Sequence, residues 1–202
     1  MKVIVTGGCG FIGSHFIRLL LEMRPDWEVI NLDALTYAGN LLTTMDIQTH
    51  SQYHFVYGSI TNTELIHTLV QKADTVVNFA AETHVDRSID DAEPFIMTNI
   101  LGVYRLARAC VKYGKRFHHV STDEVFGSLG EHEPKFNEHS APKPRNPYSA
   151  TKAAGDHLLK ACMHTHGLRA TISHCTNNYG TFLYPEKFLA IAITNLIESK
   201  PV

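Results

Sequence analysis

The sequence predicts an α/β protein with a doubly wound parallel sheet and helices on both of its faces. Strand-like apolar runs alternate with helical patterns along the chain, and such alternation is typical of βαβ units. The runs at 3–6, 75–79 and 117–121 are close to continuously apolar, as expected of strands covered on both faces. A glycine cluster follows the first run directly and precedes a helical pattern.

The elements follow from these patterns in order. Strands are predicted at 2–6, 28–32, 53–57, 75–79, 117–121 and 170–174, and helices at 11–23, 64–70, 94–112 and 148–166. The segment 122–147 reads as a long, proline-rich loop that leaves the carboxyl end of a central strand. A long loop inside a compact domain is either functional or disordered. Open parallel sheets hold their ligands at that edge, which favours a functional loop. We therefore expect the site to include this loop.

Composition excludes several classes of protein. A net charge of −2 over 202 residues argues against nucleic acid or an anionic membrane as a partner. No apolar run approaches the roughly 20 residues that a bilayer requires, and the first residues do not resemble a signal peptide. The 4 cysteines are scattered without a CxxC pair, which favours reduced thiols in a cytoplasmic protein. The histidine pairs lack further ligands at metal spacing, so no metal site is expected.

The stretch "TGGCGFIGS" (6–14) predicts a dinucleotide-binding turn. Gly7, Gly10 and Gly13 would permit a tight turn and a close approach of the backbone to a pyrophosphate. The helix that follows offers free N–H groups to the phosphates. Asp33 ends the second strand, where an acid binds the adenosine ribose hydroxyls. No Arg or Lys occurs from 32 to 42 to receive a 2′-phosphate, so NAD is favoured over NADP.

The stretch "NPYSATK" (146–152) predicts a catalytic pair. Asn146 is a suitable helix cap and Pro147 a suitable first residue. Tyr148 and Lys152 are spaced i and i+4, so they share one face of the helix. A nearby ammonium lowers the pKa of a tyrosine from its usual value near 10. The pair could then take a proton from a sugar hydroxyl while NAD takes the hydride.

In these motifs the chain resembles the extended short-chain dehydrogenase/reductases, and in particular their dTDP-glucose 4,6-dehydratase branch. The matching stretches are "NLDALTYAGNL" (31–41), "NFAAETHVDRSI" (78–89), "STDEVFG" (121–127), "YSATKAAGDHL" (148–158) and "TNNYGTFLYPEKF" (176–188). Related sugar-nucleotide epimerases share the glycine and tyrosine motifs but do not usually carry the Asp-Glu pair. The resemblance implies a Rossmann-like domain.

The resemblance also implies a reaction and its acid and base. The reaction would convert dTDP-glucose to dTDP-4-keto-6-deoxyglucose and water, in deoxysugar biosynthesis. Asp123 would protonate the leaving C6 oxygen and Glu124 would remove the C5 proton. Thr122 would hold the C4 oxygen region, where Tyr148 is the base.

Further site residues follow by matching each motif to the family. For the cofactor, they are Phe11 and Ile12 at the pyrophosphate, Asp33, Ala34, Leu35 and Thr36 at the adenosine, Ser59 and Ile60 at the adenine, and Phe79, Ala80, Ala81, Glu82, Thr83, Thr98 and Asn178 along the remainder. For the sugar nucleotide, they are Thr83, Thr122, Asn177, Glu186 and Lys187.

The resemblance leaves some questions open. Members of the family are longer than this chain, so we expect 1–175 to form the NAD-binding domain with the catalytic residues and 176–202 to begin an incomplete substrate-binding region. A homodimer formed through the helices at 94–112 and 148–166 is expected. The alternatives are a 4,6-dehydratase for UDP-glucose or another hexose nucleotide, or a catalytically silent NAD-binding fragment.

Overall fold

The computed structural model describes all 202 residues, and at its centre lies one parallel six-stranded sheet. Its strands are β1 (Lys2–Thr6), β2 (Glu28–Asp33), β3 (Tyr53–Tyr57), β4 (Thr75–Asn78), β5 (Arg116–Thr122) and β6 (Arg169–Cys175). Their order is β3-β2-β1-β4-β5-β6, and each neighbouring pair is parallel. The order reverses between β1 and β4, which is where such sheets open a ligand crevice. The predicted doubly wound fold is confirmed.

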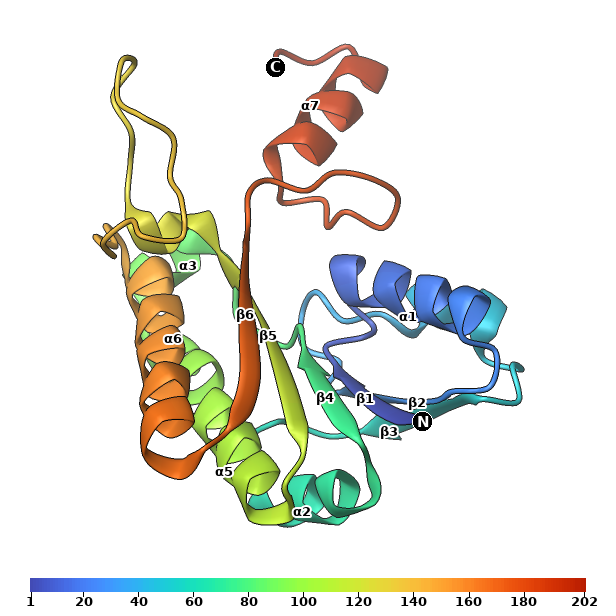
Figure 1. Ribbon diagram of the computed structural model, residues 1–202. Helices are drawn as coiled ribbons and strands as arrows, with labels where there is room; N and C mark the ends of the chain where they lie inside the picture. Colours follow the sequence, from blue (N-terminus) through green and yellow to red (C-terminus); the bar gives the residue numbers. More distant parts are fainter.

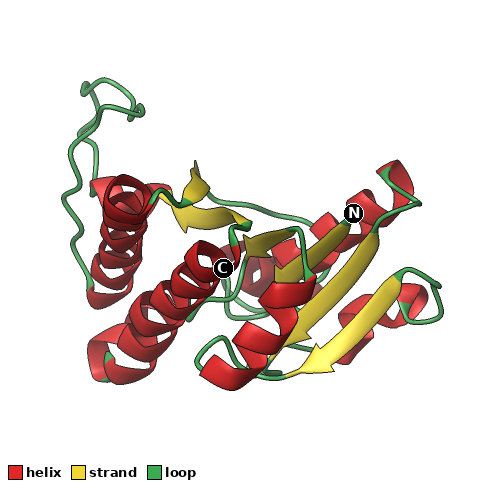
Figure 2. Ribbon diagram, turned by 60° about the horizontal axis from the view of Figure 1, so that its bottom comes forward, coloured by secondary structure: helices red, strands yellow, loops and turns green.

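Helices cover both faces of this sheet (Figures 1 and 2). Helix α1 (Phe11–Met23) covers one face, and α2 (Thr63–Lys72), α5 (Val103–Tyr113) and α6 (Pro147–His166) cover the other. Each helix follows a strand and returns the chain for the next parallel strand, as βαβ units require.

The core is divided by the sheet into two clusters. Val3 and Val5 of β1 belong to the cluster that includes Ile17 of α1, whereas Ile4 between them belongs to the cluster that includes Leu106 of α5. Successive strand side chains point to opposite faces, so a strand with a helix layer on each face must be apolar at every position. This explains the near-continuous apolar runs in the sequence.

Helix α6 begins at the crevice because of its cap. The side chain of Asn146 accepts a hydrogen bond from the Ser149 N–H, and the Ser149 hydroxyl receives the Asn146 N–H in return. Pro147 occupies the first turn, as expected of a residue without an N–H to satisfy. The helix ends before Gly167, whose φ is 65°. Tyr148, the second residue of α6, therefore lies at the edge of the crevice.

The structure corrects two of the predicted elements. The predicted helix 94–112 consists of α4 (Glu93–Phe95), a π-helical segment η2 (Ile96–Gly102) and α5. The segment predicted as a loop from 122 begins with a 3₁₀ turn, η3 (Asp123–Phe126), and only then becomes irregular. Elements absent from the sequence prediction are η1 (Leu41–Ile47), α3 (Val85–Asp90) and α7 (Phe188–Ile197).

Helix α7 differs from the others because none of its residues is buried. It lies beyond the carboxyl ends of the strands, at the top of Figure 1. Its exposed side chains include Phe188, Ile193 and Ile197. The division of the chain into 1–175 and 176–202 remains a prediction. None of the helices combines the length and the apolar character needed to cross a membrane.

Candidate active site

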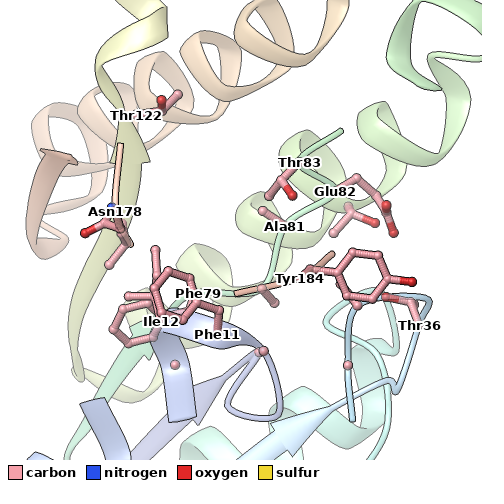
Figure 3. Close-up of a pocket in the computed structure, with 18 of the residues that line it drawn as sticks. Phe11, Ile12, Thr36, Phe79, Ala81, Glu82, Thr83, Thr122, Asn178 and Tyr184 are labelled. Atoms are coloured by element: carbon pink, nitrogen blue, oxygen red, sulfur yellow. The ribbon is translucent and has the colours of Figure 1, made fainter. Parts of the chain in front are cut away.

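A cavity of about 470 Å³ opens at the carboxyl edge of the sheet. Its walls come from the β1–α1 turn, from the segments that follow β2, β3, β4, β5 and β6, from η2, and from the starts of α6 and α7. Figure 3 shows Phe11, Ile12 and Asn178 on one side of the cavity and Thr36, Glu82 and Tyr184 on the other. The volume and the mixed polar and apolar walls are typical of a small-molecule site.

The β1–α1 turn needs its glycines. Gly7 has a φ of 71°, and a Cβ there would lie 2.6 Å from the Ala80 nitrogen. A Cβ on Gly13 would lie 2.3 Å from the Gly7 oxygen. Gly10 caps α1 without a side-chain hydrogen bond, so the first N–H groups of the helix stay available to an anion at the cavity. The glycine turn thus fits a pyrophosphate, as predicted from its spacing.

Asp33 links this turn to the segment after β2. Its Oδ2 accepts from the Cys9 N–H at 2.8 Å, and its Oδ1 accepts from the Leu35 N–H at 2.8 Å. Burial raises the pKa of this carboxyl above its usual value, and the two N–H groups act in the opposite direction. Each carboxylate oxygen retains a lone pair for a ribose hydroxyl. Leu35 itself has a φ of 49° and does not line the cavity, so its contact is with Asp33.

The segment after β4 is held by Asn99, which sequence reasoning did not identify. Asn99 Oδ1 accepts from the Glu82 N–H, and its Nδ2 donates to the Glu82 carbonyl, both at 3.0 Å. Nδ2 also donates to Thr151 Oγ1 at 3.1 Å. Asn99 lies in the π-helical segment η2, and π-turns inside helices often occur at functional sites. One buried amide therefore joins the cavity wall to the helix that carries Tyr148.

Tyr148 and Lys152 share the buried face of α6, but the predicted effect of the lysine on the tyrosine is not found. Burial raises the pKa of Tyr148, and the negative charge of Glu124 adds to this, while the Thr122 side chain acts in the opposite direction. Lys152 donates from Nζ to the Val120 carbonyl at 2.8 Å. Burial lowers the pKa of this lysine to about 8. The lysine is thus directed at β5 and not at the phenol oxygen.

The Thr-Asp-Glu trio forms a compact acidic turn beside Tyr148. Thr122 Oγ1 accepts from the Glu124 N–H at 3.3 Å and donates to Asp123 Oδ1 at 3.4 Å. Asn146 Nδ2 donates to Glu124 Oε2 at 3.4 Å. Gly127, with a φ of 96°, ends the turn. Thr122 and Glu124 line the cavity, whereas half-buried Asp123 does not.

The outer wall of the cavity carries a charged cluster that was only partly predicted. Glu186 Oε2 lies 3.6 Å from His84 Nε2 and 3.7 Å from Arg87 Nη2. Tyr37 donates to Glu186 Oε1 at 3.3 Å. Lys187 donates from Nζ to the Thr83 carbonyl at 3.4 Å. The sequence could have indicated Tyr37, His84 and Arg87, because they lie in the quoted stretches 31–41 and 78–89.

Most of the predicted site residues meet at this one cavity. Those that line it are Gly7, Gly10, Phe11, Ile12, Gly13, Asp33, Ala34, Thr36, Ser59, Ile60, Phe79, Ala80, Ala81, Glu82, Thr83, Thr98, Thr122, Glu124, Tyr148, Lys152, Asn177, Asn178, Glu186 and Lys187. Leu35 and Asp123 are the two that do not. The roles of these residues remain predictions. No group of three or more His, Cys, Asp or Glu side chains is arranged to hold a metal ion.

Known proteins with similar sequences and structures support this description. The dTDP-glucose 4,6-dehydratase of Mycobacterium tuberculosis is 44% identical over 201 residues, which are 99% of this chain and 60% of that protein. The dTDP-glucose 4,6-dehydratase of Streptomyces venezuelae, solved with NAD bound, is 43% identical with a TM-score of 0.94, covering 98% of this chain and 63% of that one. UDP-glucuronic acid 4-epimerase of Bacillus cereus, also solved with NAD, is 31% identical with a TM-score of 0.90, covering 100% and 64%.

The chain therefore spans about 60% of the length of the curated relatives that it matches. A family model described as GDP-mannose 4,6 dehydratase matches residues 4–200. The match extends from the first strand, through the glycine turn, the acidic turn and the Tyr148/Lys152 helix, to α7. This protein belongs to the GDP-mannose 4,6-dehydratase family of sugar-nucleotide enzymes.

Proposed function

We propose that the chain carries the NAD-binding and catalytic part of a hydro-lyase that converts dTDP-glucose to dTDP-4-keto-6-deoxyglucose. The observation that carries the proposal is that Thr122 and Glu124 line the same cavity as Tyr148, with Asp123 between them in the turn. An epimerase needs only proton and hydride transfer at C4, whereas a dehydratase must also eliminate water across C5–C6. The dTDP-glucose 4,6-dehydratases among its relatives support this choice.

The residues present fit a dinucleotide cofactor. The glycine turn leaves space that a Cβ would fill, and the first turn of α1 has N–H groups available at the cavity. We assign Asp33 to the ribose hydroxyls, because its two oxygens each accept one backbone N–H and keep a further lone pair. Bound NAD would supply a hydride acceptor at C4 and a hydride donor at C6. We propose NAD as the cofactor also because two of the similar structures contain it.

The chain's own residues would divide the proton transfers among them. Tyr148 takes the proton of the C4 hydroxyl, and the adjacent Thr122 hydroxyl holds that oxygen. Glu124, held by Asn146, takes the C5 proton. Asp123 gives a proton to the departing C6 oxygen, so that water leaves. Glu124 then returns its proton to C5.

The proton count leaves the site in need of a reset after each turnover. Tyr148 has gained one proton and Asp123 has lost one, while Glu124 is unchanged. The hydroxyl of Thr122 donates to Asp123 and interacts with Tyr148. A hydroxyl can accept one proton while it releases another, so Thr122 is placed to return the proton from the tyrosine to the acid.

The test is to replace the acidic pair with Asp123→Asn and Glu124→Gln. The amides keep the size of the side chains but cannot exchange protons as acids or bases. The double variant should still oxidise C4, so reduced nicotinamide accumulates when dTDP-glucose is added, while exchange of the C5 proton with deuterated solvent falls by a factor of about 10² or more. Normal formation of the 6-deoxy product would refute the dehydratase assignment.

The nucleotide base is tested with a panel of substrates. dTDP-glucose, UDP-glucose and GDP-mannose share the diphosphate and differ in base or sugar. We expect dTDP-glucose to have the highest kcat/KM. If another sugar nucleotide has the highest kcat/KM, the proposed dehydration stands but the proposed substrate is wrong.

We further propose a cytoplasmic homodimer. The side chains of Ile96, Met97 and Tyr104 are exposed on η2 and α5, and Met163 is exposed on α6. These apolar groups lie on the helices that we expect to pair between subunits. All 4 cysteines are free thiols, which suits a reducing compartment. Sedimentation of a monomer at micromolar concentration would contradict the dimer.

A further inference from the structure

Asp156 extends the catalytic face of α6 by one more turn. Tyr148, Lys152 and Asp156 are spaced i, i+4 and i+8, so they form one line along the helix. Asp156 is only 4% exposed. Burying a carboxylate costs free energy unless it is paired and hydrogen-bonded. Asp156 has no part in the proposed proton transfers, so its burial needs another explanation.

Asp156 is held by residues of the two neighbouring strands. Its Oδ2 accepts from Ser121 Oγ on β5 and from His174 Nε2 on β6, both at 2.9 Å. Its Oδ1 has no hydrogen-bond partner and lies 3.7 Å from His119 Nε2. The carboxylate is therefore fixed by one oxygen, while the other lies near the His119 ring.

His119 stands between this free oxygen and Lys152. Asn78 Oδ1 accepts from Thr6 Oγ1 at 2.6 Å, which leaves the Asn78 Nδ2 to donate to His119 Nδ1 at 2.9 Å. With Nδ1 as the acceptor, the ring proton is on Nε2, which lies 3.5 Å from Lys152 Nζ. Burial holds the pKa of His119 well below its usual value, so the ring is neutral. Its protonated Nε2 cannot accept a hydrogen bond from Lys152, so the ring separates the ammonium from the carboxylate without bonding the ammonium.

Lys152 needs a counter-charge because it is only 3% exposed. Burial lowers its pKa to about 8, and the negative charge of Asp156 acts in the opposite direction. The other titratable groups near Lys152 are Tyr148 on its own helix, His119 on β5, and Cys175 on β6. His118 on β5 and His174 on β6 act on His119, and Glu124 of η3 acts on Tyr148. Asp156 is thus the carboxylate that is matched to the lysine.

We propose that Asp156, held by Ser121 and His174, is a positioning residue that keeps Lys152 protonated and so sets the upper pH limit of the Tyr148/Lys152 site. The link to turnover rests on the proposed function, whereas the charge pairing does not. If Asp156 loses its charge, the buried ammonium loses its compensation and gives up its proton at a lower pH.

The first experiment titrates Lys152 directly. Lysine labelled with ¹³C at the ε carbon is followed by NMR in the parent protein and in Asp156→Asn, and the Lys152 signal is identified by its loss in Lys152→Met. We expect the Lys152 titration midpoint to fall by about one pH unit or more in Asp156→Asn. An unchanged midpoint would overturn the proposal.

The second experiment measures how the same substitution changes the pH dependence of kcat. The alkaline limb of the kcat profile should move to lower pH in Asp156→Asn by the same amount as the NMR midpoint, with little change in KM. A uniform loss of kcat at every pH would show a merely structural role and overturn the positioning role. If the NMR midpoint moves in a protein without dehydratase activity, the charge pairing stands and the proposed function fails.

A matched set of variants covers the case in which Asp156→Asn does not fold. His174→Leu leaves Asp156 Oδ2 with Ser121 alone and should lower the Lys152 midpoint, whereas His174→Gln keeps a donor and should leave it in place. Equal midpoints in these two variants would also overturn the proposal. The control is His118→Gln, because His118 contacts Thr171 and Ser173 on the other face of β5, and no change is expected.

Discussion

Asp33 is the side chain that we expect to select NAD over NADP. Its carboxylate is fixed by two backbone N–H groups, and no Arg or Lys occurs from 32 to 42. A 2′-phosphate would therefore meet a negative charge without a compensating cation. We expect NAD to bind at least tenfold more tightly than NADP, a difference of about 1.4 kcal/mol.

Calorimetry with the two cofactors checks this expectation, and two variants separate charge from structure. Asp33→Asn keeps an oxygen acceptor for one of the N–H groups and removes the charge. It should therefore reduce the difference between the affinities for NAD and NADP. Asp33→Ala removes the charge and both acceptors, so it should also weaken binding of both cofactors. Equal affinities for NAD and NADP in the parent protein would contradict the selection of NAD by Asp33.

Tyr148 is the residue whose loss should cost the most in turnover. Tyr148→Phe keeps the ring that packs against Phe95 and removes only the hydroxyl. We expect kcat to fall by a factor of about 10² or more, the usual scale for general-base catalysis, with cofactor affinity retained. Tyr57→Phe, at a residue that is 71% exposed, is the control. Near-normal turnover in Tyr148→Phe would exclude this tyrosine as the base.

Spacing along the chain predicted the residues of the site that share an element, and it missed those whose partners are distant. Tyr148 and Lys152 are one helical turn apart, so their common face could be predicted. Asn99 and Asp156 form their hydrogen bonds with Glu82, Ser121 and His174, which only the folded sheet brings near. The orientation of Lys152 toward the Val120 carbonyl was missed for the same reason.

At the scale of elements, segments with a clear apolar pattern were predicted closely, and segments without one were missed. Helix α1 and strand β3 have the predicted bounds. Helix α3 has the sequence "VDRSID", which is too short and too polar to show an apolar period. The π-helical segment η2 continues the helical path without a glycine or proline in its first six residues, so no local signal distinguishes it from the expected helix.

The contact between α6 and η2 depends on Gly155. A Cβ there would lie 2.7 Å from the Asn99 carbonyl oxygen. We expect Gly155→Ala to lower the free energy of unfolding in urea by about 1–3 kcal/mol, because the backbones must move apart. Gly130→Ala, where the nearest atoms would be 3.6 Å from the new Cβ, should change it little. If both variants lose equal stability, close backbone packing is not the cause.

At the scale of the whole molecule, buried His119 makes stability depend on pH. Its folded-state pKa lies well below the usual value of 6.5, so below that pH the unfolded chain takes up a proton that the folded protein does not. The free energy of unfolding should therefore fall as the pH falls below 6.5, with a slope of at most about 1.4 kcal/mol per pH unit from this group. Lys152 acts in another range, because its lowered pKa makes stability rise from about 8 to 10.5.

Urea unfolding of the parent protein and of His119→Gln at several pH values between about 7.5 and 5 isolates this contribution. The parent should lose stability more steeply than the variant as the pH falls. His118 stays in both proteins, so its own lowered pKa cancels in the comparison. Parallel curves would show that His119 does not control acid stability.

The strand order also governs how the chain reaches its folded state. Lys2 pairs with Glu28, Val3 with Thr75 and Arg116 with Arg169, so the sheet contains no hairpin. Each pairing requires a long loop to close before its hydrogen bonds form, and that entropy makes such sheets slow to fold. The crevice lies between β1 and β4, whose pairing spans the longest stretch of chain in the sheet. A nascent chain therefore exposes unpaired strand edges until this pair has closed, and such edges can pair with other chains and aggregate.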